Sequence, residues 1–234
     1  MLIKMPMQSI FRIAFILTFA LVFIHIAVFL NWHLGGIRND FTIMFVSFFD
    51  LSTDTSIPTW FSSLLLLLCA GFLFIIYKHK KSLNDRFQYH WLGLACIFLT
   101  FSIDEVATMH EVIGGRLGKR FMGEAGGLLH YSWVIFGGIF VAACALIYLK
   151  FILHLPKEIK FMFLLSMGIY FGGALGIEMF SGQYSEANDS WSLGYALWTA
   201  AEEFCEMIGI SLFLLMTLEY ICKYMDGLTL QIGE

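Results

Sequence analysis

The chain has 234 residues, of which 59% are hydrophobic and only 14% are charged, and its mean hydropathy is +0.78. A soluble domain carries about 25% charged residues, so this composition excludes a soluble globule and indicates a helical membrane protein. The net charge of -4 and the absence of a long basic face also exclude nucleic-acid binding.

Six apolar segments are long enough to cross the ~30 Å hydrocarbon core of a membrane. They cover residues 11–31, 59–77, 90–112, 128–150, 160–181 and 197–221. We therefore expect an all-α integral membrane protein, in which residues 1–234 form one domain, a bundle of six transmembrane helices. The first segment is longer than the apolar core of a signal peptide, so we expect a retained helix.

The basic residues predict how the bundle is oriented. Ten Lys and Arg residues flank one side of the predicted helices and four flank the other, so the positive-inside rule places both termini in the cytoplasm. We expect the protein in the plasma (inner) membrane. Three loops then face outward, at residues 32–58, 113–127 and 182–196. Near this side we expect an aromatic belt of tryptophans, Trp60, Trp133, Trp191 and Trp198.

The outward segment 113–127 contains six glycines and three basic residues. Its simplest interpretation is a flexible connection. The alternative is that its backbone amides and cations bind a phosphate or a lipid headgroup.

Seven of the eighteen carboxylates fall within the outward halves of the predicted helices. They are Asp104, Glu105, Glu111, Glu178, Glu202, Glu203 and Glu206. At ~1.5 Å per helical residue, all seven lie within roughly 15 Å of the outer surface, at the level of His110 and His130. Four helices therefore contribute polar groups to one layer.

Helical geometry predicts which of these groups share a face. At ~100° per residue, Asp104 and Glu111 lie on one stripe of a continuous helix 90–112, and His110 points away from that stripe. Glu202 and Glu206 share a stripe on the last helix, so two acidic stripes can face each other. Glycines repeat every fourth residue on the fifth helix and form a strip for close packing near Glu178, at Gly168, Gly172 and Gly176.

A carboxylate in the bilayer costs about 2.5–3.5 kcal/mol, so seven of them cannot all be charged, dry and unpaired. No Lys or Arg within the predicted helices balances them, which leaves bound cations, bound protons or a water-filled vestibule. Carboxylates combined with imidazoles suit iron, manganese or zinc, so we expect a divalent metal as cofactor.

The expected metal ligands are Asp104, Glu105, Glu111, His130, Glu178, Glu202 and Glu206. Glu203 is the candidate general base, and His110 is a candidate catalytic residue or a further ligand. For both histidines an interfacial, non-ligating role stays open. The spacing of the acids also differs from the Glu-x-x-His pairs of soluble di-iron bundles.

Three functions follow from this layer. The first is a membrane metalloenzyme that acts on a lipid, a quinone or another small apolar molecule from the outer leaflet. The second is a proton- or cation-coupled transporter, which the scarcity of ionisable groups in the inner halves of the helices disfavours. The third is a non-catalytic subunit or binding module, as a homo-oligomer or within a membrane complex. In each case the bilayer is a partner.

Overall fold

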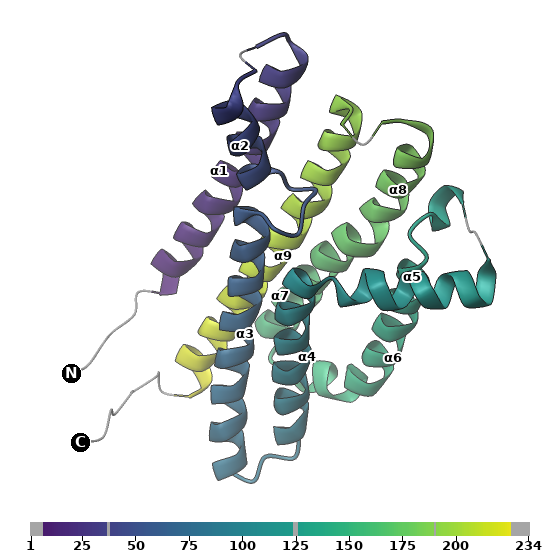
Figure 1. Ribbon diagram of the computed structural model, residues 1–234. Helices are drawn as coiled ribbons and strands as arrows, with labels where there is room; N and C mark the ends of the chain where they lie inside the picture. Colours follow the sequence, from purple (N-terminus) through teal and green to yellow (C-terminus); the bar gives the residue numbers. More distant parts are fainter. Residues whose placement is uncertain (1–6, 37, 124–125, 190, 226–234) are drawn as a thin grey trace.

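The computed structural model describes residues 7–36, 38–123, 126–189 and 191–225, and every regular element within these ranges is helical (Figure 1). Six helices are long and apolar enough to cross a membrane, as the sequence predicts. Five of these spans are α1 (Met7–His33), α3 (Ile57–Ser82), α4 (Gln88–Ala107), α6 (Trp133–His154) and α9 (Leu193–Tyr224). The remaining span joins α7 (Lys157–Phe171), the π-helix η2 (Gly172–Ile177) and α8 (Glu178–Ala187).

Short helices occupy much of the segments that we expected to be outward loops. They are α2 (Asp40–Phe49), α5 (Met109–Met122) and the 3-10 turn η1 (Gly127–Leu129). The side chain of Asn39 caps α2 by accepting a hydrogen bond from the Thr42 amide. Figure 1 shows α5 lying nearly at right angles to the spans. The prediction of a flexible connection at 113–127 is therefore wrong for residues 113–122.

The prediction of one continuous helix over 90–112 is also wrong. Thr108 adopts a left-handed conformation (φ 49°, ψ 35°), which ends α4 and lets α5 leave in a new direction. The carboxylate of Asp104 accepts a hydrogen bond of 2.8 Å from the backbone N–H of His110, in the first turn of α5. Residues beyond Thr108 therefore do not continue the stripe that begins at Asp104.

The last span, α9, is the centre of the bundle. It contacts α1, α3, α7, η2 and α8. Phe213 of α9 stacks on Phe98 of α4 with ring centroids 4.3 Å apart, and Phe163 of α7 meets Phe213 at 5.5 Å. All three rings are buried, so this part of the core is packed with apolar side chains.

The close approach of the fifth span to α9 uses different glycines from those predicted. The positions of Gly168, Gly172 and Gly176 face open space. A Cβ atom at Gly173 would instead lie 2.8 Å from the Glu202 carbonyl oxygen, and one at Gly209 would lie 2.7 Å from the Tyr170 amide nitrogen. The wider turn of η2 changes the register of this span, so a period of four residues does not follow one face.

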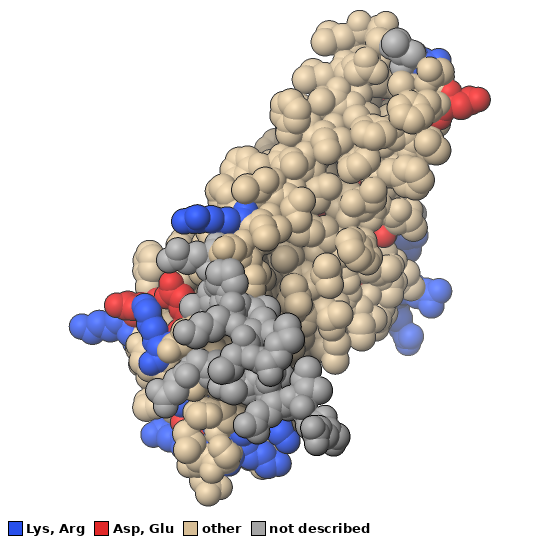
Figure 2. All heavy atoms as spheres, turned by 90° about the vertical axis from the view of Figure 1, so that its left-hand side faces the viewer, with Lys and Arg blue, Asp and Glu red and all other residues tan. Residues whose placement is uncertain are grey.

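The outside of the bundle is largely apolar. Large exposed hydrophobic side chains are frequent on α1, α6 and α7. Figure 2 shows a broad surface without charged side chains on one face, and Lys and Arg side chains gathered near its lower end. Of the six spans, α6 is the least buried and α9 the most buried.

Candidate functional site

A cavity of about 540 Å³ lies between the spans and α5, on the side of the bundle where α4 ends and α6 begins. Among the residues that the structure describes, no Lys or Arg lines it, whereas eight carboxylates do. They are Asp54, Asp104, Glu105, Glu111, Glu178, Glu202, Glu203 and Glu206. Their exposure differs, since Asp54 and Glu111 are exposed and Glu178 is only 7% exposed. The cavity thus runs from water-accessible acids to a buried one.

His110 and Asp104 form a hydrogen-bonded pair at the start of α5. The Nδ1 atom of His110 lies 2.7 Å from Oδ2 of Asp104. Burial lowers the pKa of His110, but the hydrogen bond and the charge of Asp104 outweigh burial and raise this pKa above its usual value. The expectation that His110 points away from the acids is wrong, because the helix break at Thr108 returns its ring to Asp104.

Trp133 connects this pair to the buried end of the cavity. Its indole N–H donates a 2.7 Å hydrogen bond to Oε1 of Glu178, and its ring lies edge-on to His110 with centroids 4.3 Å apart. We expected Trp133 in the aromatic belt, which is wrong for this residue. Asp104, His110, Trp133 and Glu178 therefore form a chain of contacts across α4, α5, α6 and α8.

The acids of α9 approach the cavity from the opposite side. Ser181 of α8 donates a 3.0 Å hydrogen bond to Oε2 of Glu202. The carboxylates of Glu203 and Glu206 line the same cavity, and neither accepts a hydrogen bond from another described side chain. Glu178 and Glu202 are thus held by neutral donors, whereas Glu203 and Glu206 have no such donor among the described side chains.

Asp54 and Glu111, the two exposed acids, lie nearer the mouth of the cavity. Partial burial raises the pKa of Asp54, although the nearby His110 opposes this shift. Partial burial and the charge of Asp54 raise the pKa of Glu111. Protons therefore bind more readily at this mouth than at carboxylates in water.

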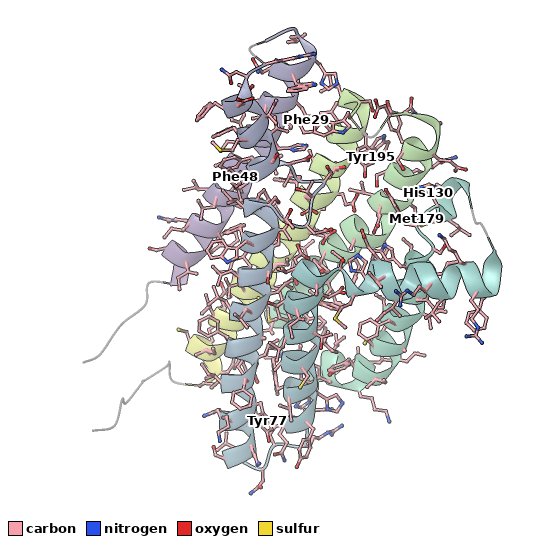
Figure 3. All side chains as sticks on the ribbon, in the orientation of Figure 1. Phe29, Phe48, Tyr77, His130, Met179 and Tyr195 are labelled. Atoms are coloured by element: carbon pink, nitrogen blue, oxygen red, sulfur yellow. The ribbon has the colours of Figure 1, made fainter. Side chains whose placement is uncertain are left out.

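One expected ligand lies elsewhere. His130 is exposed, packs against Tyr131 with ring centroids 5.0 Å apart, and does not line the cavity (Figure 3). The other eight predicted site residues all line it. Within the described part of the chain, however, no three His, Cys, Asp or Glu side chains converge closely enough to hold a metal ion.

Comparison with known proteins gives a family match over most of the chain. A family model described as "Domain of unknown function (DUF8692)" matches residues 14–220. The chain belongs to this family. Every residue that lines the cavity falls within the DUF8692 match. No curated protein and no solved structure matches the chain.

Several cavity residues of this DUF8692 protein were not among the residues expected from sequence. They are Asp54, Tyr131, Trp133, Tyr170, Ser181 and Tyr195, the last of which is labelled in Figure 3. Ser181 had a usable signal, because it follows Glu178 by three residues and so lies on the same helical face. Asp54 had none, since its approach depends on how the segment before α3 folds back over the bundle.

Proposed function

We propose that this protein is a multi-pass membrane metalloenzyme that binds a divalent cation in the acidic cavity and acts there on a small apolar substrate. The observation that carries the proposal is a single cavity lined by eight carboxylates and, within the described residues, by no Lys or Arg. The exposed apolar surface of α1, α6 and α7 supports placement in a membrane, which we propose to be the plasma (inner) membrane. The excess of basic residues at the inner boundaries supports cytoplasmic termini.

The charge of the cavity favours a bound cation. Carboxylates that are removed from water are costly unless they are paired with cations or hold protons. Here Trp133 and Ser181 supply neutral hydrogen bonds to Glu178 and Glu202, and these donors do not balance the charge. A divalent ion would neutralise two carboxylates and attract the others.

His110 has the geometry of an oriented metal ligand. Its Nδ1 atom is bound to Asp104, which leaves Nε2 as the atom available to a metal. Histidines that bind metals commonly direct their other ring nitrogen to a carboxylate in this way. The raised pKa of His110 means that a metal must displace a proton from the ring, so affinity should increase with pH. Iron, manganese or zinc suit this mixture of oxygen and nitrogen ligands.

Metal binding in this cavity requires side-chain movement. Like-charged carboxylates repel one another, and no three of the described ligand-type side chains converge as they stand. The proposal therefore requires the unpaired carboxylates of Glu203 and Glu206 to turn toward an ion bound near His110. A residue left outside the ion's coordination shell, for which Glu203 is our candidate, would serve as general base.

The inner core argues against the alternative of a cation transporter. The buried rings of Phe98, Phe163 and Phe213 pack together between α4, α7 and α9, and none of them lines the acidic cavity. A transported ion would need a hydrated or polar route through this region. A non-catalytic subunit with the same acidic cavity is the second alternative, and the absence of turnover in a metal-loaded protein would favour it.

Metal analysis of the purified protein tests the proposal. Protein produced with iron, manganese and zinc, then desalted, should retain metal in stoichiometric amounts. The double variant Glu202→Gln, Glu206→Gln should lose it. Glu219→Gln is the matched control, because Glu219 lies on the same helix but pairs with Lys223 at 3.3 Å, outside the cavity. Wild-type protein that retains no metal after loading would overturn the proposal.

A further inference from the structure

The acidic cavity has an apolar extension on its inner side. On α4 this extension is lined by Cys96, Ile97 and Phe101, which precede Asp104 by one to two helical turns. On α6 it is lined by Phe140 and Val141, which follow Trp133 by about two turns. We call this part of the cavity the apolar arm. It leads from the acids toward the middle of the bundle.

The apolar arm reaches the outside of the bundle between α4 and α6. Cys96 and Phe140 line the cavity and are also exposed. At the ends of the two helices away from the acids, aromatic rings connect them, and Trp91 meets Phe151 with ring centroids 4.9 Å apart. Nearer the acids, one ring contact joins α4 and α6 among the described residues, between Phe101 and Phe140 with ring centroids 5.9 Å apart. In a membrane this side of the bundle faces lipid chains.

Tyr170 lies where the apolar arm meets the acids. Its side chain lines the cavity, is 7% exposed and stacks on Phe101 with ring centroids 6.1 Å apart. Its hydroxyl group makes no hydrogen bond to any other described residue. Because Tyr170 lines the cavity, this hydroxyl is available to form a hydrogen bond with a polar group of a ligand.

We propose that the cavity binds a single-chain amphiphile whose tail occupies the apolar arm and whose polar end, carrying no negative charge, lies at Tyr170 and the carboxylates. Entry between α4 and α6 lets the tail leave the bilayer without crossing water. An anionic headgroup is disfavoured because eight carboxylates and, in the described lining, no Lys or Arg would face it, and because His110 is already paired with Asp104. The cavity volume of about 540 Å³ lies in the range of sites for small molecules. The amphiphile's role as substrate rests on the proposed metalloenzyme function.

Photolabelling with a long-chain alcohol that carries a diazirine in its tail tests this inference. In nanodiscs the probe should label peptides containing Ile97, Phe101, Phe140 or Val141, and labelling should saturate. Unlabelled alcohol and amine of the same chain length should compete about tenfold better than the fatty acid. The competition is measured after chelation, so that no bound metal can coordinate the acid. Competition by the fatty acid at equal strength would overturn the inference.

Two tryptophan variants of α6 provide the matched comparison. Val141→Trp should fill the apolar arm and abolish saturable labelling. Leu146→Trp, at a position 77% exposed and outside the cavity lining, should leave it unchanged. Unfolding midpoints show whether each variant folds, and Ile97→Phe replaces Val141→Trp if the latter does not. Saturable labelling that survives in a folded arm variant would overturn the inference.

The metal content of the same preparations separates this inference from the proposed function. Stoichiometric metal without saturable labelling of the apolar arm would overturn the amphiphile inference alone. Saturable labelling of the arm in protein that retains no metal would overturn the metalloenzyme proposal alone.

Discussion

The hydrogen bond between Trp133 and Glu178 predicts a measurable coupling within the site. Trp133→Phe removes the indole N–H but keeps an aromatic ring beside His110. The bond is 2.7 Å long and Glu178 is 7% exposed, so the variant leaves a buried carboxylate with one donor fewer. Because leaving a buried hydrogen-bonding group without its partner costs about 1–3 kcal/mol, we expect the free energy of unfolding to fall by that amount.

A double-mutant cycle isolates this contribution from the loss of packing. In a Glu178→Leu background, Trp133→Phe should cost only the packing difference between the two rings. Unfolding midpoints in detergent provide the assay, and for a chain of this size about 1 kcal/mol corresponds to about 2–4 °C. Trp198→Phe is the control, since Trp198 is 37% exposed and stacks on Phe180 without a hydrogen bond to another described residue. A coupling energy below about 0.5 kcal/mol would refute the reasoning.

Three other changes test packing, titration and ligand binding. Gly209→Ala places a Cβ atom 2.7 Å from the Tyr170 amide nitrogen and should destabilise the protein by about 1–3 kcal/mol. Gly168→Ala is the control, because a Cβ atom there faces open space and should not destabilise the protein. Denaturation midpoints that fall equally in the two variants would contradict this prediction. The pKa of His110 is higher in the folded protein than in the unfolded chain, where it is about 6.5. The pair of His110 with Asp104 therefore contributes its full stability below about pH 6.5, and this contribution is lost as the pH rises through the folded-state pKa of His110. The stability difference between wild type and Asp104→Asn should therefore shrink on alkaline titration, and a constant difference would count against the pairing. Tyr170→Phe should weaken binding of the alcohol probe by about tenfold but leave an alkane probe unaffected, as measured by labelling competition; equal losses would point to a packing defect.

The sequence was sufficient to predict the six spans, because a span depends on local length and hydropathy. It also predicted that the acids share one level, since the helical rise is regular and carries Asp104, Glu178 and Glu202 to similar depths. Eight of the nine predicted site residues line one cavity. Their metal binding stays a proposal.

Two backbone features were not predictable from residue spacing. Thr108 is β-branched and rarely adopts the left-handed conformation, so nothing in its neighbourhood indicated a break between α4 and α5. Half of the residues of the π-helix Gly172–Ile177 are glycines, but their spacing does not indicate a wider turn. The first feature changed the expected position of His110, and the second accompanies the packing contact at Gly173.

The π-helix makes the two halves of one span rotationally independent. The residues of α7 that pack on α9 and the residues of α8 that face the cavity therefore do not have to follow one continuous helical repeat. A π-turn holds about one residue more than an α-turn, so deleting one residue within Gly172–Ile177 would restore a regular α-helix with α8 close to its present rotation about the span. Deleting one residue between Glu178 and Ser181 would instead rotate the rest of α8 by about 100° and carry Ser181 away from Glu202. The wider turn is therefore the place in this span where a change of chain length displaces the residues that face the cavity least.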